Sequence, residues 1–300
     1  MEDLRFVMTE QKAVEEIRRA IEKAPLLSAN AQRLMQITAD TDHELGDVID
    51  IVKCDATLTA RVLRVVNSAA YDLLNPISSI DRAVSYLGER MVTCIAIGDS
   101  VGNLMNRPMA GYQAAAGELW RHDLFTAFAA REIARCARGD MTIDLAFTAG
   151  LLHDIGKAIL SEFLHGSAEN LVGDIDAGHV ENYLGGEKKL LGMDHAEIGL
   201  ELAKSWQLPT PLQSAIAFHH EPQRAPEEDR LLVYAVHLGD IIAMMNGFGT
   251  GSDSMQYQLD QGYQDYLEFD TKQLPGIILE ATELFRQAEA SLTQNQETES

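Results

Sequence analysis

The stretch Ala149-Gly-Leu-Leu-His-Asp-Ile-Gly-Lys157 places a histidine and an aspartate side by side in an apolar segment that is otherwise typical of a helix. Burying an imidazole and a carboxylate among leucines is costly unless each finds a partner. A metal ion is one such partner, and a hydrogen-bonded pair in the core is another. Lys157 follows the doublet by three and four residues and therefore emerges on the same side of the helix. It could orient an anionic ligand or neutralise carboxylates.

Other histidines and carboxylates extend this possible metal site. Glu118 and His122 are four residues apart and share a helix face, so both could point at one ion. His219 and His220 end a helix, where adjacent imidazoles can reach two different ions. The candidates in other helices are His195, at a helix start, and Asp240. Nitrogen and oxygen ligands of these kinds suit Zn, Mn, Fe, Ni or, with more oxygen ligands, Mg.

The charge of such a pocket depends on whether metal is bound. Two divalent cations bring four positive charges, against three negative charges if Glu118, Asp154 and Asp240 are all ionised ligands. A filled pocket would then attract a phosphate group, and an empty pocket would repel it. Metal occupancy would therefore decide whether an anionic ligand binds.

The remaining histidines give weaker signals. His43, His165 and His179 lie in polar segments flanked by Gly or Asp, which is typical of surface positions. His237 precedes Asp240 by one helical turn, so it could support a metal ligand from behind, although a position in the core or on the surface is the commoner role.

Helical periodicity recurs along the chain, and no stretch shows the sustained alternation of a strand. Ser28 is a plausible N-cap, and Ser78-x-x-Asp81 resembles a capping box for a helix that ends before Gly88. The apolar residues are mainly Ala, Leu, Ile, Val and Met, which favours an all-α fold. The predicted helices cover residues 10–23, 28–37, 57–66, 118–138, 143–163, 180–191, 196–206, 211–220 and 229–245.

Loops divide this helical chain into units. We expect an N-terminal helix at 1–23, one domain at 24–246 and a C-terminal helical extension with a frayed tail at 247–300. A loose connection near 107–117 separates a helical half at 24–106 from a half at 117–246 that carries the candidate metal site. The loop at 247–254 is interpreted as flexible, and its Gly-x-Gly pattern follows no strand, which argues against a nucleotide-binding loop.

The net charge of −22, from 46 acidic and 24 basic residues, excludes the basic surface that nucleic-acid binders use, and it disfavours an anionic membrane. Cys54, Cys94 and Cys136 form no C-x-x-C pair, which favours reduced thiols. The acidic start lacks the pattern of a secretory signal. No apolar stretch approaches the roughly 20 residues of a membrane span. We therefore expect a cytoplasmic protein.

The order of His122, His153-Asp154 and Asp240 resembles the H…HD…D signature of the HD superfamily of metal-dependent phosphohydrolases. The flanking sequence is most similar to one branch, the HDOD domain (HD-related output domain), over about 24–245. The matching segments are 53–68, 77–88, 146–157, 195–199 and 206–209. This resemblance implies an all-helical HD-type core preceded by an N-terminal helical bundle, and a role in bacterial signal transduction.

The candidate pocket also resembles that of the HD-GYP cyclic-dinucleotide phosphodiesterases. That resemblance implies that Lys157 matches the lysine that follows the His-Asp pair in that family. It also implies a larger set of metal ligands. Its members are Glu118, His122, His153, Asp154, His195, His219, His220 and Asp240. After Glu221 that family continues into a Gly-Tyr-Pro loop, whereas this chain reads Pro-Gln-Arg-Ala-Pro226. The lost loop argues against cyclic-dinucleotide hydrolysis and leaves the ligand set in place.

Three functions are compatible with these features. The first is a regulatory output module that binds a signalling protein, a phosphorylated small molecule or a nucleotide without turnover. The second is a metal-dependent phosphohydrolase or phosphodiesterase, in which Asp154 bridges two ions and Lys157 neutralises developing charge. The third is a metal or redox sensor in which the same ligands hold iron.

Overall fold

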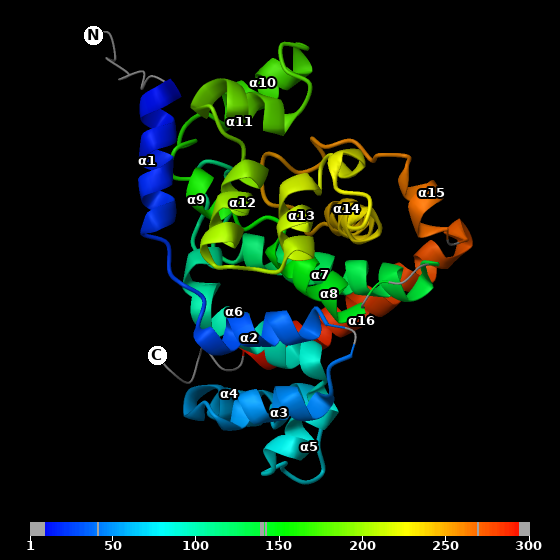
Figure 1. Cartoon of the computed structure of the whole chain (residues 1–300). Coiled ribbons are helices and arrows are strands. Elements are labelled where there is room, and N and C mark those ends of the chain that lie inside the picture. The colour runs from blue at the N-terminus through cyan, green and yellow to red at the C-terminus, as the bar shows by residue number, and fades with distance from the viewer. Residues whose placement is uncertain (1–9, 41, 139–140, 142, 269, 294–300) are drawn as a thin grey trace.

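The computed structural model describes residues 10–40, 42–138, 141, 143–268 and 270–293. Residues 1–9 and the predicted frayed tail at 294–300 lie outside these ranges. Within them the secondary structure is helical, and a single isolated bridge joins Met109 and Ala114 (Figure 1). The prediction of an all-α fold is confirmed.

The helices follow one another without an intervening strand in the described ranges. The α-helices are α1 (Glu10–Glu22), α2 (Ala29–Thr38), α3 (Leu45–Lys53), α4 (Ala56–Val66), α5 (Ile80–Leu87), α6 (Glu89–Met105), α7 (Glu118–Cys136), α8 (Ile143–Leu152), α9 (Lys157–Leu160), α10 (Ala168–Asp176), α11 (Tyr183–Leu191), α12 (His195–Ser205), α13 (Thr210–Phe218), α14 (Arg230–Met245), α15 (Tyr263–Leu267) and α16 (Leu274–Thr293). Short 3-10 turns are η1 (Ala69–Tyr71), η2 (Pro222–Arg224) and η3 (Thr271–Gln273). None of the described helices is both long enough and apolar enough to span a bilayer.

Helices α2 to α6 form a bundle at the bottom of Figure 1. Ser28 caps α2 by accepting a hydrogen bond from the Ala31 N–H, as the sequence predicted. Asp55 caps α4 in the same way, accepting from the N–H groups of two residues in its first turn. The apolar stripe of α4 is buried, and its members are Leu58, Val62, Val65 and Val66. Side-chain capping thus begins α2 and α4, and an apolar face buries α4 in the bundle.

Some local predictions in this half were wrong. Ser79, not Ser78, precedes α5, and its side chain makes no capping hydrogen bond. The Asp81 carboxylate instead pairs with the Lys53 ammonium group of α3, 2.8 Å away, so it is not free to close a capping box. The sequence analysis also predicted no helix at α3, α6 or α10, and each of these helices contains at least one internal glycine.

The other half is built around α7, which packs against α8 and α14 (Figure 1). Two of these helices carry sequence-predicted ligands, Glu118 and His122 in α7 and Asp240 in α14, and His153 directly follows α8. Helix α1 packs against α9, α11 and α12 of the second half. Helix α16 packs against α7 of the second half and against α4 and η1 of the first half. Both ends of the described chain therefore connect the two halves, and the division into units at 23/24 and 246/247 remains a prediction.

Candidate metal centre

The His153-Asp154 doublet lies in a turn and not, as predicted, inside one helix at 143–163. Helix α8 ends at Leu152 and α9 begins at Lys157. Gly156 in this turn lies against the first turn of α12, where a Cβ atom would be 1.9 Å from the carbonyl oxygen of His195. This close approach requires a glycine, and the same contact brings the turn that carries Asp154 next to His195.

One group of ligand atoms forms where α7, α8 and α14 meet. His122 Nε2 lies 3.3 Å from His153 Nε2. Asp154 Oδ2 lies 3.5 Å from the first of these nitrogens and 3.6 Å from the second. Asp240 Oδ1 lies 3.2 Å and 3.8 Å from the same two atoms. Asp123 also faces this group and could contribute a carboxylate oxygen.

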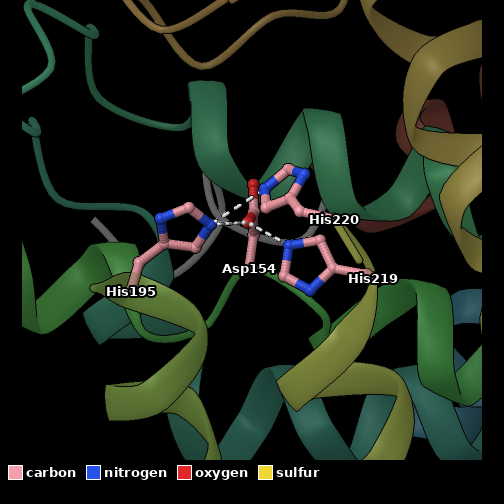
Figure 2. Close-up of side chains that lie close together, drawn as sticks. All are labelled: Asp154, His195, His219 and His220. Carbon is pink, nitrogen blue, oxygen red and sulfur yellow. Dashed lines mark hydrogen bonds and ion pairs between the residues drawn. The ribbon is translucent and has the colours of Figure 1, made fainter. Parts of the chain in front are cut away.

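A second group forms on the other side of Asp154 (Figure 2). Asp154 Oδ1 lies 3.4 Å from His195 Nε2 and 3.4 Å from His219 Nε2. His220 Nε2 lies 3.0 Å from His195 Nε2. The two oxygens of one carboxylate thus face two different sets of imidazoles, which is the arrangement of a ligand that bridges two cations.

The spacing of these atoms fits a metal ion. Imidazole nitrogen and carboxylate oxygen bind Zn²⁺ at about 2.0–2.2 Å, so ligand atoms on one ion lie about 3.0–3.4 Å apart in tetrahedral or octahedral geometry. The distances from Asp154 to the four imidazoles, 3.4–3.6 Å, are only slightly longer. Both groups could therefore close on a divalent cation with small movements.

The hydrogen bonds of the imidazoles fix which ring nitrogen is free. In four of them Nδ1 lies against an oxygen that accepts, so Nδ1 carries the proton, and Nε2 carries a lone pair whenever the imidazole is neutral. The pairs are His122 with Phe248 O (2.6 Å), His153 with Gly150 O (2.8 Å), His219 with Ile216 O (2.9 Å) and His195 with Glu187 Oε2 (2.8 Å). All four lone pairs converge on carboxylates, and such a cluster of acceptors is stabilised by a cation.

The pKa values of the imidazoles shift in both directions. Although burial alone would lower both values, Asp240 raises the pKa of His122 and Glu187 raises the pKa of His195. Burial and the neighbouring His153 and His195 lower the pKa of His219 to about 4. Burial would raise the pKa of Asp154, but the nearby Lys157 ammonium and the imidazoles hold it well below its usual range. Asp154 Oδ1, Asp240 Oδ2, His219 Nε2 and His220 Nδ1 are buried atoms without a hydrogen-bond partner. A divalent cation binds deprotonated nitrogen and oxygen atoms that have a free electron pair.

Lys157 neutralises carboxylates, which is one of the two roles that the sequence allowed. Its buried Nζ lies 2.6 Å from Asp154 Oδ2 and 2.6 Å from Asp253 Oδ2. It also donates to the Thr250 hydroxyl, 3.1 Å away. Although burial alone would lower the pKa of Lys157, these two carboxylates raise it, so the ammonium stays charged.

The structure brings together seven of the eight predicted ligands but not Glu118. The seven are His122, His153, Asp154, His195, His219, His220 and Asp240. Glu118 is the first residue of α7, and its carboxylate accepts a hydrogen bond from the Ala115 N–H at 2.8 Å. A carboxylate in the first helical turn is stabilised there by unpaired backbone N–H groups. The structure therefore places the Glu118 carboxylate apart from the other seven predicted ligands.

The other histidines divide between surface and support. His165 and His179 are exposed, as predicted, whereas His43 is half-buried and pairs with Glu89 at 2.5 Å. His237 is buried behind the site. Its Nδ1 donates to the His219 carbonyl at 2.7 Å, and its Nε2 accepts from the Asp260 N–H at 2.9 Å. His237 therefore fixes the backbone of a candidate ligand.

Three acidic residues near the site were missed by the sequence reasoning. Asp123 directly follows His122 and so repeats the His-Asp doublet, a signal that could have been noticed. Glu187 is buried and accepts hydrogen bonds from the Tyr112 hydroxyl at 2.6 Å and the His195 N–H at 2.9 Å. It precedes two lysines in the sequence and looks like a surface charge. Asp253 lies in the loop that was interpreted as flexible.

Comparisons with known proteins agree on one family. The model of the HDOD domain matches residues 24–222. An uncharacterized protein of Treponema pallidum (strain Nichols) is 26% identical over 220 residues, which cover 72% of this chain and 41% of that protein. The chain thus spans about two fifths of the length of this relative.

Two solved structures share the fold. An HDOD domain protein of unknown function from Geobacter sulfurreducens is 24% identical, with a TM-score of 0.64 over 97% of this chain and 96% of its own. A protein of Marinobacter aquaeolei VT8, provisionally assigned to signal transduction, is 21% identical, with a TM-score of 0.71 over 96% of this chain and 66% of its own. At these identities the likeness establishes the architecture alone.

Proposed function

The chain belongs to the HDOD family of the HD superfamily, and from this membership we propose that it is a regulatory output module built around a divalent-metal pocket. The module binds a signalling protein or a phosphorylated small molecule and does not turn it over. The provisional assignment of the Marinobacter protein to signal transduction supports this role. The net charge of −22 supports a partner other than a nucleic acid.

The observation that carries this proposal is the convergence of four imidazole Nε2 lone pairs on the carboxylate of Asp154. One ion would be held by His122, His153 and Asp240, and the other by His195, His219 and His220, with Asp154 between them. A divalent cation there supplies a Lewis acid and positive charge that attracts an anionic ligand. The protein's own part is to hold each imidazole in the Nδ1–H tautomer through the oxygen behind it.

Binding without turnover is supported by how closed the pocket is. His122, His153, Asp154, His195 and His219 are at most 1% exposed. The ring of Tyr257 stacks on His220 with centroids 3.8 Å apart and an angle of 16° between the planes. Lys157, which would meet an incoming anion, is already paired with two carboxylates. A substrate has no direct approach to the ligand atoms in this state.

A metal-dependent phosphohydrolase or phosphodiesterase is the second candidate. It is favoured by the two oxygens of Asp154, which face two separate imidazole groups as a binuclear site requires. Lys157 would then help to stabilise negative charge on the reacting phosphoryl group. This function requires that the segment over the pocket move away during each turnover.

Metal content and hydrolysis, measured together, separate these functions. Purified protein reconstituted with Mn²⁺, Fe²⁺ or Zn²⁺ should retain one or two equivalents in elemental analysis, and the double variant His153→Ala, Asp154→Ala should retain none. Retention of metal without hydrolysis of bis(4-nitrophenyl) phosphate supports the module. Hydrolysis that is lost in the double variant supports the phosphodiesterase. Failure of the wild-type protein to retain any of these metals contradicts both.

A further inference from the structure

The segment at 247–260, here called the strap, follows α14 and folds back over the candidate metal centre. Near its start, the Phe248 carbonyl accepts the hydrogen bond from His122 Nδ1 at 2.6 Å. At its end, the Asp260 N–H donates to His237 Nε2 at 2.9 Å, and His237 in turn holds the His219 carbonyl. The strap therefore contacts the supports of both imidazole groups.

The middle of the strap is attached to Lys157. Asp253 is fully buried, and its Oδ2 lies 2.6 Å from Lys157 Nζ. The same carboxylate accepts hydrogen bonds from the Thr250 hydroxyl at 2.9 Å and the Tyr257 hydroxyl at 3.0 Å. Tyr257 itself lies flat on His220. These contacts hold the Asp253 carboxylate in a fixed position beside Lys157.

The backbone of the strap fits a shaped seat. Gly251 has a φ of 107°, and a Cβ atom there would lie 2.1 Å from the Tyr112 carbonyl oxygen. The Ser252 N–H donates to that same oxygen at 2.7 Å, and the Ser252 hydroxyl lies 3.0 Å from the Tyr183 hydroxyl. The interpretation of this loop as merely flexible is therefore wrong, because its glycine permits close packing on Tyr112.

We propose that the strap is an autoinhibitory closure of the metal pocket, in which Asp253 takes the place of an anionic ligand on Lys157. This inference rests on the proposed function and adds how the pocket is regulated. An incoming phosphate group must displace the Asp253 carboxylate, because the other carboxylate on Lys157, Asp154, belongs to the metal site. The strap lies beyond residue 222, where the match to the family model ends.

Displacement of the strap would also reach the metal ligands. When Asp253 leaves, the bonds of Phe248 to His122 and of Asp260 to His237 are strained, and the stacking of Tyr257 on His220 is lost. Anion binding, strap opening and metal coordination are therefore coupled. By linkage, whatever opens the strap alters the affinity for metal, and metal alters the opening of the strap by the same factor.

The variant Asp253→Asn tests this closure in the full chain. It removes the negative charge and keeps the size, so the carboxylate no longer competes for Lys157. In Mn²⁺-loaded protein we expect inorganic phosphate to bind at least about tenfold more tightly than to the wild type in calorimetry, a typical coupling factor. Amide hydrogen exchange across 248–260 should become faster with or without metal. Asp265→Asn, which removes one exposed charge from α15, is the matched control and should behave like the wild type.

A second variant with a smaller change tests the closure if Asp253→Asn fails to fold. Tyr257→Phe removes only the hydroxyl that donates to Asp253, so exchange in the strap should increase by a smaller factor. Unchanged phosphate affinity and unchanged exchange in both variants would overturn the closure. Absence of bound metal in the wild type would instead contradict the proposed function, and hydrogen exchange on the metal-free protein would still decide whether the Asp253–Lys157 pair holds the strap.

Discussion

The two halves of the molecule bury different chemistry. Among the described residues up to 117, the buried polar side chains are those of Thr38 and Thr93, and charged groups form pairs at the surface. The half that begins with α7 buries a cluster of imidazoles and carboxylates together with Lys157. Burial of charge costs folding free energy unless partners compensate it. Apolar packing therefore dominates the first half, whereas the second buries charged groups for which we propose a divalent cation as the partner.

The largest effect should follow a change at the shared carboxylate. Asp154→Asn removes the charge that faces both imidazole groups and leaves Lys157 with one partner. We expect metal affinity to fall at least about 100-fold, and loss of one member of a buried ion pair to cost about 3–5 kcal/mol of unfolding free energy. Elemental analysis and urea unfolding measure the two effects. Asp174→Asn, on the surface of α10, is the control and should change neither.

A cavity in the first half should lower the stability of the protein without changing its metal content. Ile51 of α3 is 2% exposed and lies in the lower bundle of Figure 1. Ile51→Ala should lower the free energy of unfolding by about 2–5 kcal/mol through lost packing. Metal content should stay at the wild-type value. Loss of metal in this variant would mean that the halves are not separable and that the comparison fails.

A positioning residue of the second half should give an intermediate effect. Glu187 holds His195 through Nδ1, whereas the other three imidazoles rely on backbone carbonyls. Glu187→Gln keeps one acceptor oxygen but removes the charge behind the ligand, so metal affinity should fall about 10–100-fold without loss of the fold. Competition with a chelator of known affinity measures this change. Equal affinity would show that the charge of Glu187 does not influence metal binding through His195.

The smallest effect should come from a titratable contact within the first half, the pair of His43 and Glu89. Burial would lower the pKa of His43, but hydrogen bonds to the Asp40 carbonyl and to Glu89 raise it. A raised pKa means that this stabilisation is complete below pH 6.5 and is lost as the pH rises through the folded-state pKa. Metal-free protein should lose under about 1 kcal/mol in this window. Glu89→Gln should flatten the dependence in unfolding measured from about pH 6 to pH 9.

Sequence reasoning found the parts of the site that local chemistry reveals. His153 and Asp154 are conspicuous because polar groups rarely interrupt an apolar segment, and His219 and His220 are conspicuous as a pair. Helical periodicity was sufficient for α7, α12 and α14, whose apolar faces are long and regular. Eight ligands were proposed from the sequence, the structure brings seven of them together, and their role in binding metal remains a prediction.

The rest depends on contacts between segments that are distant in the sequence. The turn after α8 packs Gly156 against His195 of α12, and no local pattern records that contact. Glu118 shares a helix face with His122, yet its position in the first turn directs it to a backbone N–H. Glu187 and Asp253 look like surface charges until the fold places them against His195 and Lys157.

Histidine nitrogen NMR during a Zn²⁺ titration tests the central claim most directly. The account predicts that His122, His153, His195 and His219 all carry the proton on Nδ1, and that their Nε2 resonances alone move to values of metal-bound imidazole. Exposed His165 and His179 should not move, which provides an internal reference. Protonation of Nε2 in these four histidines, or Nε2 resonances that do not shift at saturating Zn²⁺, would contradict the proposed metal centre.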